Sequence, residues 1–493
     1  MNNENPEWMT LKRYPHIGFP LKRENRKGVV QYITNTEKIA HHSFTPLIRR
    51  VVITHPYRFN DEKGRKTPKP KKRDLTYASH FDSAIFSYYA DQLQREYENF
   101  IEKNGLGEVV VAYRRIPTSN NQGNKCNIHI ANDVFQYVRK RVEEGEDLAL
   151  VTFDIKGFFD SLNHKLLKKS WKKVMNWNDM PEDVYNVYKN VTKFSYVYIN
   201  SLFPLFKDKI WCESAGKYVQ KSVKRVEYMR DKKAVAFCKR EDVDIVKKQG
   251  YLQVNKKGEG IPQGLPISAV LANVYMCDFD IRISRKLKDA GGIYKRYSDD
   301  IVIVCPSNTA NQLREDILNE IKKVDLEIQK EKTNLYYISL KEGKIICSHE
   351  SKGPNKKIEY LGFSFDGEHI LLKHSGLCKY YDRMRRAKNR HIRWAISIKN
   401  NTRGEVFEHP MYKHYSLAGS IRRPIQVRRN GRLVFKRRKS YGNYLTYVKK
   451  AAAVMEEPMI RRQLRRNLNK LTKSINEIHV DVNKALRNKS LKK

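Results

Sequence analysis

Two adjacent carboxylates, Asp299 and Asp300, interrupt an apolar, β-branched run, and this stretch restricts the fold more than any other in the chain. The flanking residues predict two strands, 293–297 and 301–304, with Ser298 and the aspartates at the bend of a tight hairpin. Adjacent side chains on a strand point to opposite faces, so we expect one aspartate to face a cleft. Two anions there need a counter-charge, usually a divalent cation. Considered alone, the pattern is more typical of an ordinary Asp-Asp turn.

The charge of the whole chain indicates its partner. Its 493 residues include 97 Lys and Arg against 54 Asp and Glu, a net charge of +43, and 40% of the residues are hydrophobic, enough to build real cores. Such an excess repels itself unless a polyanion neutralises it, which favours nucleic acid over other partners. We see no apolar run of about 18 residues and no signal peptide, so no membrane partner is expected. Seven scattered cysteines without a C-x-x-C pair predict a reducing, cytoplasmic location, no disulfides and no structural zinc.

A third carboxylate follows an apolar run. Residues 148–153 predict a buried strand that ends at Asp154, and a helix is expected over 164–173. An aspartate after a strand is often a helix cap, but Asp160, with Ser161 and Asn163, suits that role better. Asp154 is therefore left free to bind metal.

A loop rich in glycine and proline lies between these two motifs, at residues 258–266. Glycines let the backbone approach a ligand closely, and Pro266 sits where a helix would start. Apolar residues over 267–275 predict that helix, whose N-terminus favours anions. Gln263 offers an amide to a base or a sugar. Alone, such a loop is a weak signal.

Other segments give simpler predictions, and residues 177–257 contain no sharp motif. From about residue 374 the composition becomes helical and very basic. We expect a basic loop over 60–73, helices over 81–97, 134–142, 313–324, 380–399 and 464–486, strands over 109–113, 326–329 and 358–365, and a hairpin over 425–436. The last helix either packs on the chain itself or binds a partner.

Asp154, the loop with Gln263, and the pair Asp299 and Asp300 form an ordered set. Asp154 and Asp299 are 145 residues apart, so they can meet only if their strands share one sheet. Two-metal phosphoryl transfer needs such a group of carboxylates, which hold two ions about 3.5–4 Å apart.

These motifs resemble those of the reverse transcriptase family. Residues 153–161 are similar to its first catalytic motif, 260–268 to its second and 297–300 to its third. Lys332 and Thr333 resemble the next motif, and Tyr360, Leu361 and Gly362 the primer-grip turn. The resemblance covers roughly residues 50–370, and the order of the motifs is specific.

The resemblance implies an α+β fold, a right-hand polymerase of fingers, palm with antiparallel sheet, and thumb, followed by a basic, mainly helical C-terminal region. The implied divisions are an N-terminal extension over 1–50, fingers over 51–147, a palm over 148–372 with an inserted segment at about 177–257, and a thumb and helical region over 373–493.

The resemblance also implies roles for individual residues. Two Mg²⁺ ions would be held by Asp154, Ile155, Asp299 and Asp300, with Asp154 and Asp299 as the main ligands. Phe159 would exclude a ribose 2′-hydroxyl. The other implied nucleotide-binding residues are Gln263, which would contact the incoming nucleotide, Arg73 and Arg114, which would hold its triphosphate, and Lys332.

Within the family, Tyr-Ser-Asp-Asp at 297–300 and the basic residues 71–73 followed by 77–82 look most like bacterial defence-associated (unknown-group, Abi-like) enzymes, related to retron and group II intron enzymes. We find no ribonuclease H-like carboxylates and no His/Cys endonuclease module after residue 370. This implies a polymerase that copies a non-coding RNA template into DNA from dNTPs in antiphage defence.

Two alternatives stay open: a catalytically silent nucleic-acid-binding scaffold, and a template-independent or ribonucleotide polymerase. Phe159 argues for deoxynucleotides. The identity of the primer also stays open: it is RNA, DNA or a protein hydroxyl, for which the chain offers 29 tyrosines. A homo-oligomeric state stays open as well.

Overall fold

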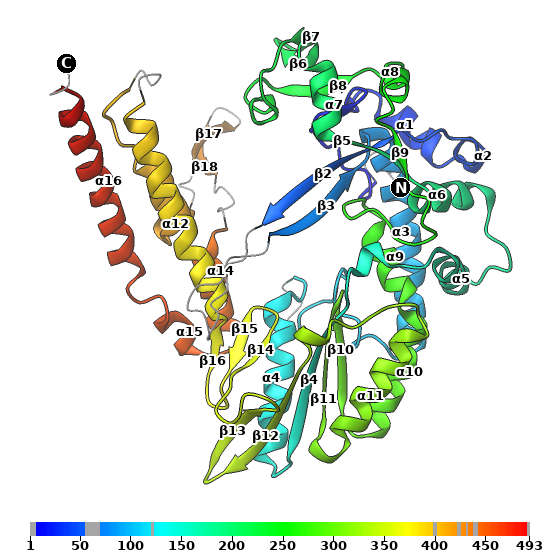
Figure 1. Ribbon diagram of the computed structural model, residues 1–493, viewed down its shortest axis with the longest axis vertical. Helices are drawn as coiled ribbons and strands as arrows, with labels where there is room; N and C mark the ends of the chain where they lie inside the picture. The colour runs from blue at the N-terminus through cyan, green and yellow to red at the C-terminus, as the bar shows by residue number, and fades with distance from the viewer. Residues whose placement is uncertain are drawn as a thin grey trace. The chain divides into compact units, whose positions relative to one another are not determined.

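A computed structural model describes residues 6–54, 70–119, 123–397, 402–421, 425–429, 432–436 and 442–490. The fold is α+β, as predicted (Figure 1). The helices are α1 Arg26–Ile33, α2 Thr36–Ala40, α3 His80–Lys103, α4 Asn127–Glu143, α5 His164–Val174, α6 Glu182–Thr192, α7 Ile199–Phe206, α8 Val243–Lys248, α9 Ser268–Tyr275, α10 Cys277–Asp289, α11 Ala310–Lys322, α12 His374–Ala395, α13 His409–Tyr415, α14 Tyr444–Val454, α15 Pro458–Arg462 and α16 Asn467–Ser490.

The strands of the described residues form five sheets. Their orders are β10-β11-β4-β12-β13, β3-β2-β5-β9, β1-β8-β6-β7, β14-β15-β16 and β17-β18. The bounds are β1 His16–Ile17, β2 Leu47–Thr54, β3 Lys71–Tyr77, β4 Leu148–Asp154, β5 Ser195–Tyr198, β6 Ile210–Ser214, β7 Lys217–Lys221, β8 Ala234–Cys238, β9 Gln253–Val254, β10 Ile293–Tyr297, β11 Asp300–Pro306, β12 Asn334–Lys341, β13 Lys344–His349, β14 Ile358–Tyr360, β15 Phe363–Phe365, β16 Ile370–Leu372, β17 Ile425–Arg429 and β18 Arg432–Lys436.

The chain divides into two compact units, each assembled from separate stretches of sequence. Unit 1 comprises Met1–Arg114, Thr152–Ile303 and Asn311–Thr333; unit 2 comprises Arg115–Val151, Val304–Ala310 and Asn334–Lys493. The candidate carboxylates all belong to unit 1.

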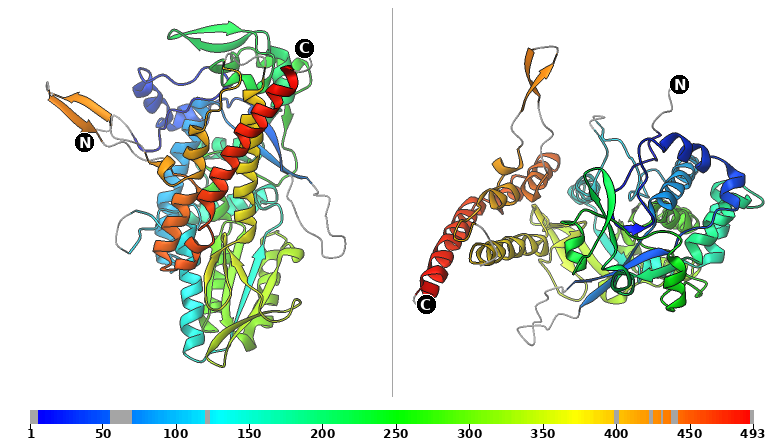
Figure 2. Two further views of the ribbon diagram at one scale, coloured as in Figure 1. Left: turned by 90° about the vertical axis from the view of Figure 1, so that its left-hand side faces the viewer. Right: turned by 90° about the horizontal axis from the view of Figure 1, so that it is seen from above.

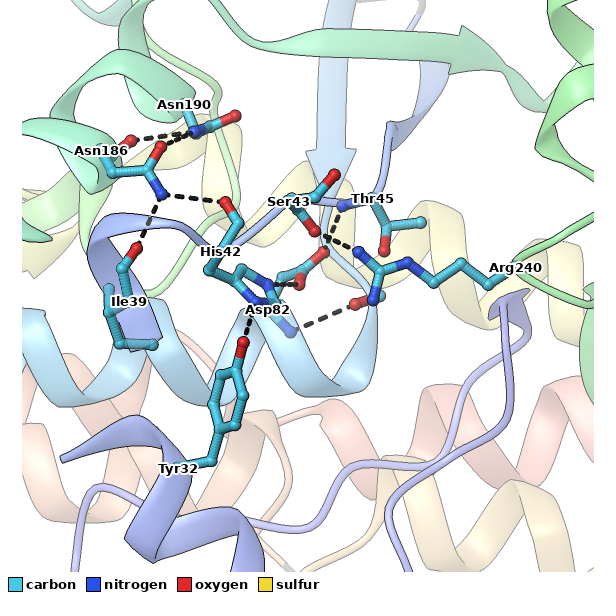
Figure 3. Close-up of polar contacts among 10 residues, drawn as sticks. Tyr32, Ile39, His42, Ser43, Thr45, Asp82, Asn186, Asn190 and Arg240 are labelled. Atoms are coloured by element: carbon cyan, nitrogen blue, oxygen red, sulfur yellow. Dashed lines mark hydrogen bonds and ion pairs between the residues drawn. The ribbon is translucent and has the colours of Figure 1, made fainter. Parts of the chain in front are cut away.

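A buried polar network fixes the N-terminal part of unit 1 (Figure 3). Nε2 of His42 lies 3.0 Å from Oδ1 of Asp82 on α3, and the Tyr32 hydroxyl lies 3.0 Å from Nδ1 of the same ring. The Thr45 amide donates to the other Asp82 oxygen at 2.9 Å, and the Asn186 amide donates to the His42 carbonyl. Because both ring nitrogens of His42 are used, the segment that leads into β2 is tied to α3 and α6.

The long C-terminal helices pack on each other within unit 2. Helices α12 and α16 lie side by side in Figures 1 and 2, and Lys388 of α12 donates to Glu477 of α16 at 2.7 Å. Four apolar residues of α16 are buried: Leu471, Ile475, Ile478 and Val482. The choice of packing within the chain is therefore confirmed for this helix. No helix in the described part of the chain is long and apolar enough to span a membrane.

Several predicted boundaries are wrong. Residues 109–113 and 326–329 contribute single bridges, Val110 to Arg296 and Ile155 to Ile328, in place of strands. The backbone adopts a positive φ at Tyr113 (61°), within the first predicted strand, and this conformation is incompatible with an extended strand.

Three other segments are divided differently from the prediction. Residues 358–365 form a hairpin rather than one strand, and the last helical pattern is split into α15 and α16 by a turn at 463–466. Residues 71–73 of the predicted basic loop belong to β3, while residues 60–69 of that loop lie outside the described residues. The predicted hairpin is confirmed as β17-β18, and its Asn-Gly bend also lies outside the described residues.

Candidate active site

The paired aspartates occupy the predicted hairpin. Asp299 lies in a two-residue turn with Ser298, between β10 and β11, and Asp300 is the first residue of β11. Ser298 has φ 62°, the sign that the first position of a II′-type hairpin turn requires. The Tyr113 hydroxyl lies 3.2 Å from Oγ of Ser298. The turn that carries Asp299 is therefore held in a conformation that L-residues adopt at a cost.

A buried ion pair supports this turn from below. The Arg296 guanidinium, with no exposed surface, donates to both carboxylate oxygens of Asp280 at 2.8 and 2.6 Å, to the Asn273 side chain at 3.2 Å and to the Ser298 carbonyl at 3.3 Å. The Tyr294 hydroxyl donates to Asp280 at 2.7 Å. Burial acts to lower the pKa of Arg296, but the charge and hydrogen bonds of Asp280 raise that pKa above its ordinary value, so the guanidinium stays charged.

This network was not predicted from the sequence. The available signal was a charged residue next to apolar ones: Arg296 just before the paired aspartates, and Asp280 between Phe279 and Ile281. Buried charges persist in such patterns only where they are paired.

Strand β4 delivers Asp154 next to the turn. Residues 148–151 of β4 are almost completely buried, and Asp154 ends the strand with its side chain 19% exposed. The Ile155 amide donates to the Asp299 carbonyl at 3.1 Å, and the Gln329 amide donates to the Asp154 carbonyl at 2.8 Å. Since β4 and β11 are neighbours in one sheet, the expectation that these strands share a sheet is confirmed.

Cationic side chains surround these carboxylates. Nζ of Lys332 lies 2.7 Å from Oδ1 of Asp154. Lys71 of β3 lies close enough to the site for its pKa to be affected. Partial burial is the main cause that lowers this pKa, and the positive charges of Lys332 and Arg73 lower it further, while the negative charges of Asp154 and Asp299 oppose the shift. The structure thus places the predicted Lys332 against Asp154, and Lys71 feels the charges of both carboxylates and of Arg73, its neighbour on β3. It adds Lys71, which the sequence analysis treated only as part of a basic run.

The glycine loop is clamped between β3 and the segment after Asp154. The Thr76 amide of β3 donates to the Gln263 carbonyl at 2.9 Å, and the Ile261 amide donates to the Phe159 carbonyl at 2.8 Å. Gly264 has φ 128°, and a Cβ on it would lie 2.5 Å from the Thr76 carbonyl oxygen. Only glycine permits this approach, so the loop needs Gly264 to place Gln263.

Arg114 has a structural role other than the predicted one, whereas Asn163 caps a helix as expected. The Arg114 guanidinium donates to Glu98 and to the carbonyls of Gly107 and Val110, and its side chain is 9% exposed. In this conformation Arg114 is an internal anchor and does not present its fork to a triphosphate. Asn163 caps α5 by accepting from the amides of residues 165 and 166, so the capping role expected of Asp160 belongs to Asn163 alone.

The predicted primer-grip residues belong to unit 2. Tyr360 ends β14, and Leu361 and Gly362 form the tight turn to β15 with φ of 42° and 91°. The Asn127 side chain donates to the Leu361 carbonyl at 3.2 Å, and the Lys373 amide donates to the Gly362 carbonyl at 3.0 Å. Helix α4 and the start of α12 therefore fix the turn.

The carboxylates suit a hard divalent cation. No group of three or more His, Cys, Asp or Glu side chains arranged to hold a metal ion occurs among the described residues. Mg²⁺ does not require one, because in polymerase-type sites it is held by one or two carboxylates together with waters and substrate phosphates. Asp154 and Asp299 supply such oxygen ligands, and the partial exposure of Asp154 leaves access.

The chain was compared with known proteins. Residues 220–365 match the family model described as reverse transcriptase (RNA-dependent DNA polymerase). This range includes Gln263, Lys332 and the paired aspartates, but not Asp154. No curated protein matches the chain.

Solved structures that resemble the chain include three telomerases. Apo telomerase from Candida tropicalis truncated from the C-terminal domain is 12% identical, and the alignment covers 72% of this chain and 61% of that one, with a TM-score of 0.39. Apo telomerase from Candida tropicalis is 11% identical (96% and 70% covered, TM-score 0.39). Telomerase from Candida albicans in complex with the TWJ fragment of telomeric RNA is 11% identical (92% and 60% covered, TM-score 0.39).

The chain thus spans about three fifths of the first of these structures, and similarity at this level does not bear on activity. The family match does bear on the site, because it contains the aspartate hairpin and the glycine loop in their structural context. Residues 220–365 are therefore similar to the reverse transcriptase family over the part of the chain that carries both motifs.

Proposed function

We propose that this protein is an RNA-templated DNA polymerase that works by two-metal nucleotidyl transfer. One observation carries the proposal: Asp154 and Asp299, 145 residues apart, are joined at the ends of neighbouring strands by the hydrogen bond from the Ile155 amide to the Asp299 carbonyl. The match of residues 220–365 to the reverse transcriptase family supports the same chemistry.

Asp154 and Asp299 would hold the metal ions, with Asp300 and Ile155 completing the ligand set. When bound, two Mg²⁺ ions would activate a primer hydroxyl and stabilise the charge on the transferred phosphate and on pyrophosphate. The chain's own contribution is to fix the carboxylates on a rigid sheet. Arg296 does so through the Ser298 carbonyl, and Lys332 orients the Asp154 carboxylate.

Residues of β3 and the glycine loop would bind the nucleotide. Arg73 would hold the triphosphate, and the charge of Lys71 beside it suits the same role. Gln263 would contact the nucleotide from a loop that is clamped to Thr76 of β3. Phe159 would fill the space of a ribose 2′-hydroxyl; its carbonyl is held by Ile261, which supports a fixed position.

Nucleotide incorporation by the purified full-length protein tests this chemistry. Asp299→Asn preserves the shape of the turn but removes the charge, so synthesis should fall by at least about a thousandfold while bound RNA is retained. Asp289→Asn, on the exposed end of α10, is the matched control and should synthesise at the rate of the unsubstituted protein. Undiminished synthesis by Asp299→Asn would refute the assignment.

We further propose that the template is a dedicated non-coding RNA and that synthesis serves antiphage defence. The motif resemblance supports these two points. In the same scheme, Tyr360 to Gly362 would act as the primer grip within a right hand of fingers, palm and thumb. Phage plating on cells that express the protein tests the defence role: protection should be lost with Asp299→Asn and kept with Asp289→Asn. Equal plating in the presence and absence of the unsubstituted protein would contradict it.

A further inference from the structure

A second cleft lies within unit 1, against the small sheet β1-β8-β6-β7. Its volume is about 1030 Å³, and its walls come from the segment before β1, from β2 and β3, and from residues 213–237. None of the candidate active-site residues lines it. The segment 177–257, in which the sequence shows no sharp motif, supplies much of its surface.

The packing of unit 1 forms the walls of this cleft. Strand β1 pairs with β8 in parallel, the Gly18 amide donates to the Cys238 carbonyl at 2.9 Å, and Nε2 of His16 lies 3.1 Å from the Tyr77 carbonyl of β3 (Figure 2 shows β6–β8 beside the dark blue N-terminal segment). Buried side chains, including Ile17 and Phe237, form one core beneath it. The cleft is therefore preformed.

The charge of the cleft suits an anion. Arg50, Arg230 and Lys233 line it with exposed side chains, and none of the three makes an ion pair with a described residue. Two carboxylates also line the cleft: Glu213, which faces Arg13 at 3.5 Å, and Glu227, so four cationic side chains stand against two anionic ones. Residues 195–257 contain 15 Lys and Arg against seven Asp and Glu. Unpaired arginines in a cleft bind phosphate groups well, because their planar forks match phosphate geometry.

Aromatic side chains accompany these cations. Tyr14, Tyr77 and Phe237 line the cleft. Beside it, Phe19 and Tyr228 are 38% and 45% exposed, and Phe19 stacks on Tyr218 with ring centroids 5.1 Å apart and planes at 11°. Exposed aromatic rings interleaved with cations are the chemistry by which proteins hold unpaired bases and their phosphates.

We propose that this cleft binds a single-stranded stretch of nucleic acid, with its phosphates on Arg50, Arg230 and Lys233 and its bases on the neighbouring rings. The site is separate from the polymerase centre. The proposal of this second site rests on the proposed function only because it takes nucleic acid as the ligand. Unpaired RNA and unpaired DNA both offer exposed bases and phosphates to these residues. A duplex does not offer its bases, because they are stacked on each other.

Photo-crosslinking locates the strand directly, which is necessary because a chain of charge +43 binds nucleic acid at many places. Full-length protein without nucleotides or Mg²⁺ is irradiated with a 4-thiouridine-containing oligouridylate of about 15 nucleotides, near the upper site size of single-strand-binding folds. We expect crosslinked peptides that contain Tyr14, Tyr77 or Tyr228. A 4-thiothymidine-containing oligothymidylate identifies whether DNA occupies the site as well, and a duplex should compete poorly.

A charge-matched pair of variants tests the cations. Arg50→Ala/Arg230→Ala should reduce these crosslinks at least about tenfold and reduce the slope of log affinity against log salt by about 1.4, since each phosphate contact on a single strand contributes about 0.7. Lys247→Ala/Lys248→Ala, exposed residues of α8 outside the cleft, should change neither.

The outcomes separate this proposal from the polymerase assignment. Asp299→Asn should crosslink like the unsubstituted protein, whether or not it synthesises DNA. Crosslinks confined to other surfaces, equal losses in the two double variants, or equal crosslinking of the duplex at Tyr14, Tyr77 and Tyr228 would overturn the proposal.

Discussion

Nζ of Lys332 lies 2.7 Å from Oδ1 of Asp154, so an ammonium group contacts the carboxylate that is proposed to hold Mg²⁺. The two cations compete for the same anion. Lys332→Ala should therefore lower the Mg²⁺ concentration needed for half-maximal synthesis about fivefold. This factor corresponds to an interaction energy of about 1 kcal/mol, which is typical of two charges about 4 Å apart in a well-solvated site. The rate at saturating Mg²⁺ should nevertheless fall at least about tenfold, because a cation facing the phosphates is lost.

Lys330→Ala is the control for this prediction, since Lys330 is exposed in the same short turn. A Mg²⁺ titration of both variants measures the effect. An unchanged Mg²⁺ requirement in Lys332→Ala would show that the contact with Asp154 does not compete with the metal.

Arg296 should govern both stability and catalysis. Arg296→Met leaves the Asp280 carboxylate buried without its partner, which should cost about 3–5 kcal/mol of unfolding free energy in urea denaturation. Arg296→Met/Asp280→Leu removes both charges and should recover most of that loss. Synthesis should stay low in the double variant, because the hydrogen bond to the Ser298 carbonyl that holds the aspartate turn is still missing. Full recovery of synthesis would mean that Arg296 acts through stability alone.

Two glycines of the nucleotide loop should respond differently to alanine. Gly264 and Gly258 both have positive φ, so each substitution carries backbone strain of about 1–2 kcal/mol. Only at Gly264 would the new Cβ meet a backbone carbonyl, that of Thr76, whereas Gly258 has open space. Gly264→Ala should cost about 1–3 kcal/mol more and raise KM for nucleotide. Thermal unfolding and KM measurements on both variants check this; equal effects would contradict the close approach.

Acid should destabilise the protein through His16. Burial lowers the pKa of His16 to about 4 from 6.5, while its contacts with the Tyr77 and Ile17 carbonyls oppose the shift. Because the folded pKa is below the unfolded value, the contribution to stability is complete above about pH 6.5 and is lost as the pH falls toward 4. Between pH 7 and pH 5 the loss from this group should be about 2 kcal/mol. His16→Gln should flatten the pH dependence of urea unfolding over this interval; an unchanged profile would assign it to other groups.

Local sequence patterns predicted the elements that carry the site. Strand β10 has the predicted bounds 293–297, and β4 ends at Asp154 as expected, because β-branched, apolar runs with a clear end define strands by themselves. The prediction that the aspartate strands share a sheet required only the chemistry of paired carboxylates.

Long-range pairing and backbone conformation could not be predicted. The same apolar pattern at 109–113 makes a single bridge, because Tyr113 turns the backbone to positive φ. Arg114 was predicted to bind phosphate, but its guanidinium is used by Glu98, which the sequence gives no reason to place beside it. The pairings of Arg296 with Asp280 and of Lys332 with Asp154 likewise depend on packing between distant segments.

Template-dependent synthesis is the sharpest test of the polymerase assignment. The purified protein is given Mg²⁺ with either deoxynucleotides or ribonucleotides, with its copurifying RNA intact or digested by ribonuclease, and the product is sequenced. We expect DNA that is complementary to the RNA and made only from deoxynucleotides. This synthesis should be abolished by ribonuclease and absent from Asp299→Asn. Synthesis that continues after ribonuclease treatment, or that proceeds equally with ribonucleotides, would contradict the assignment.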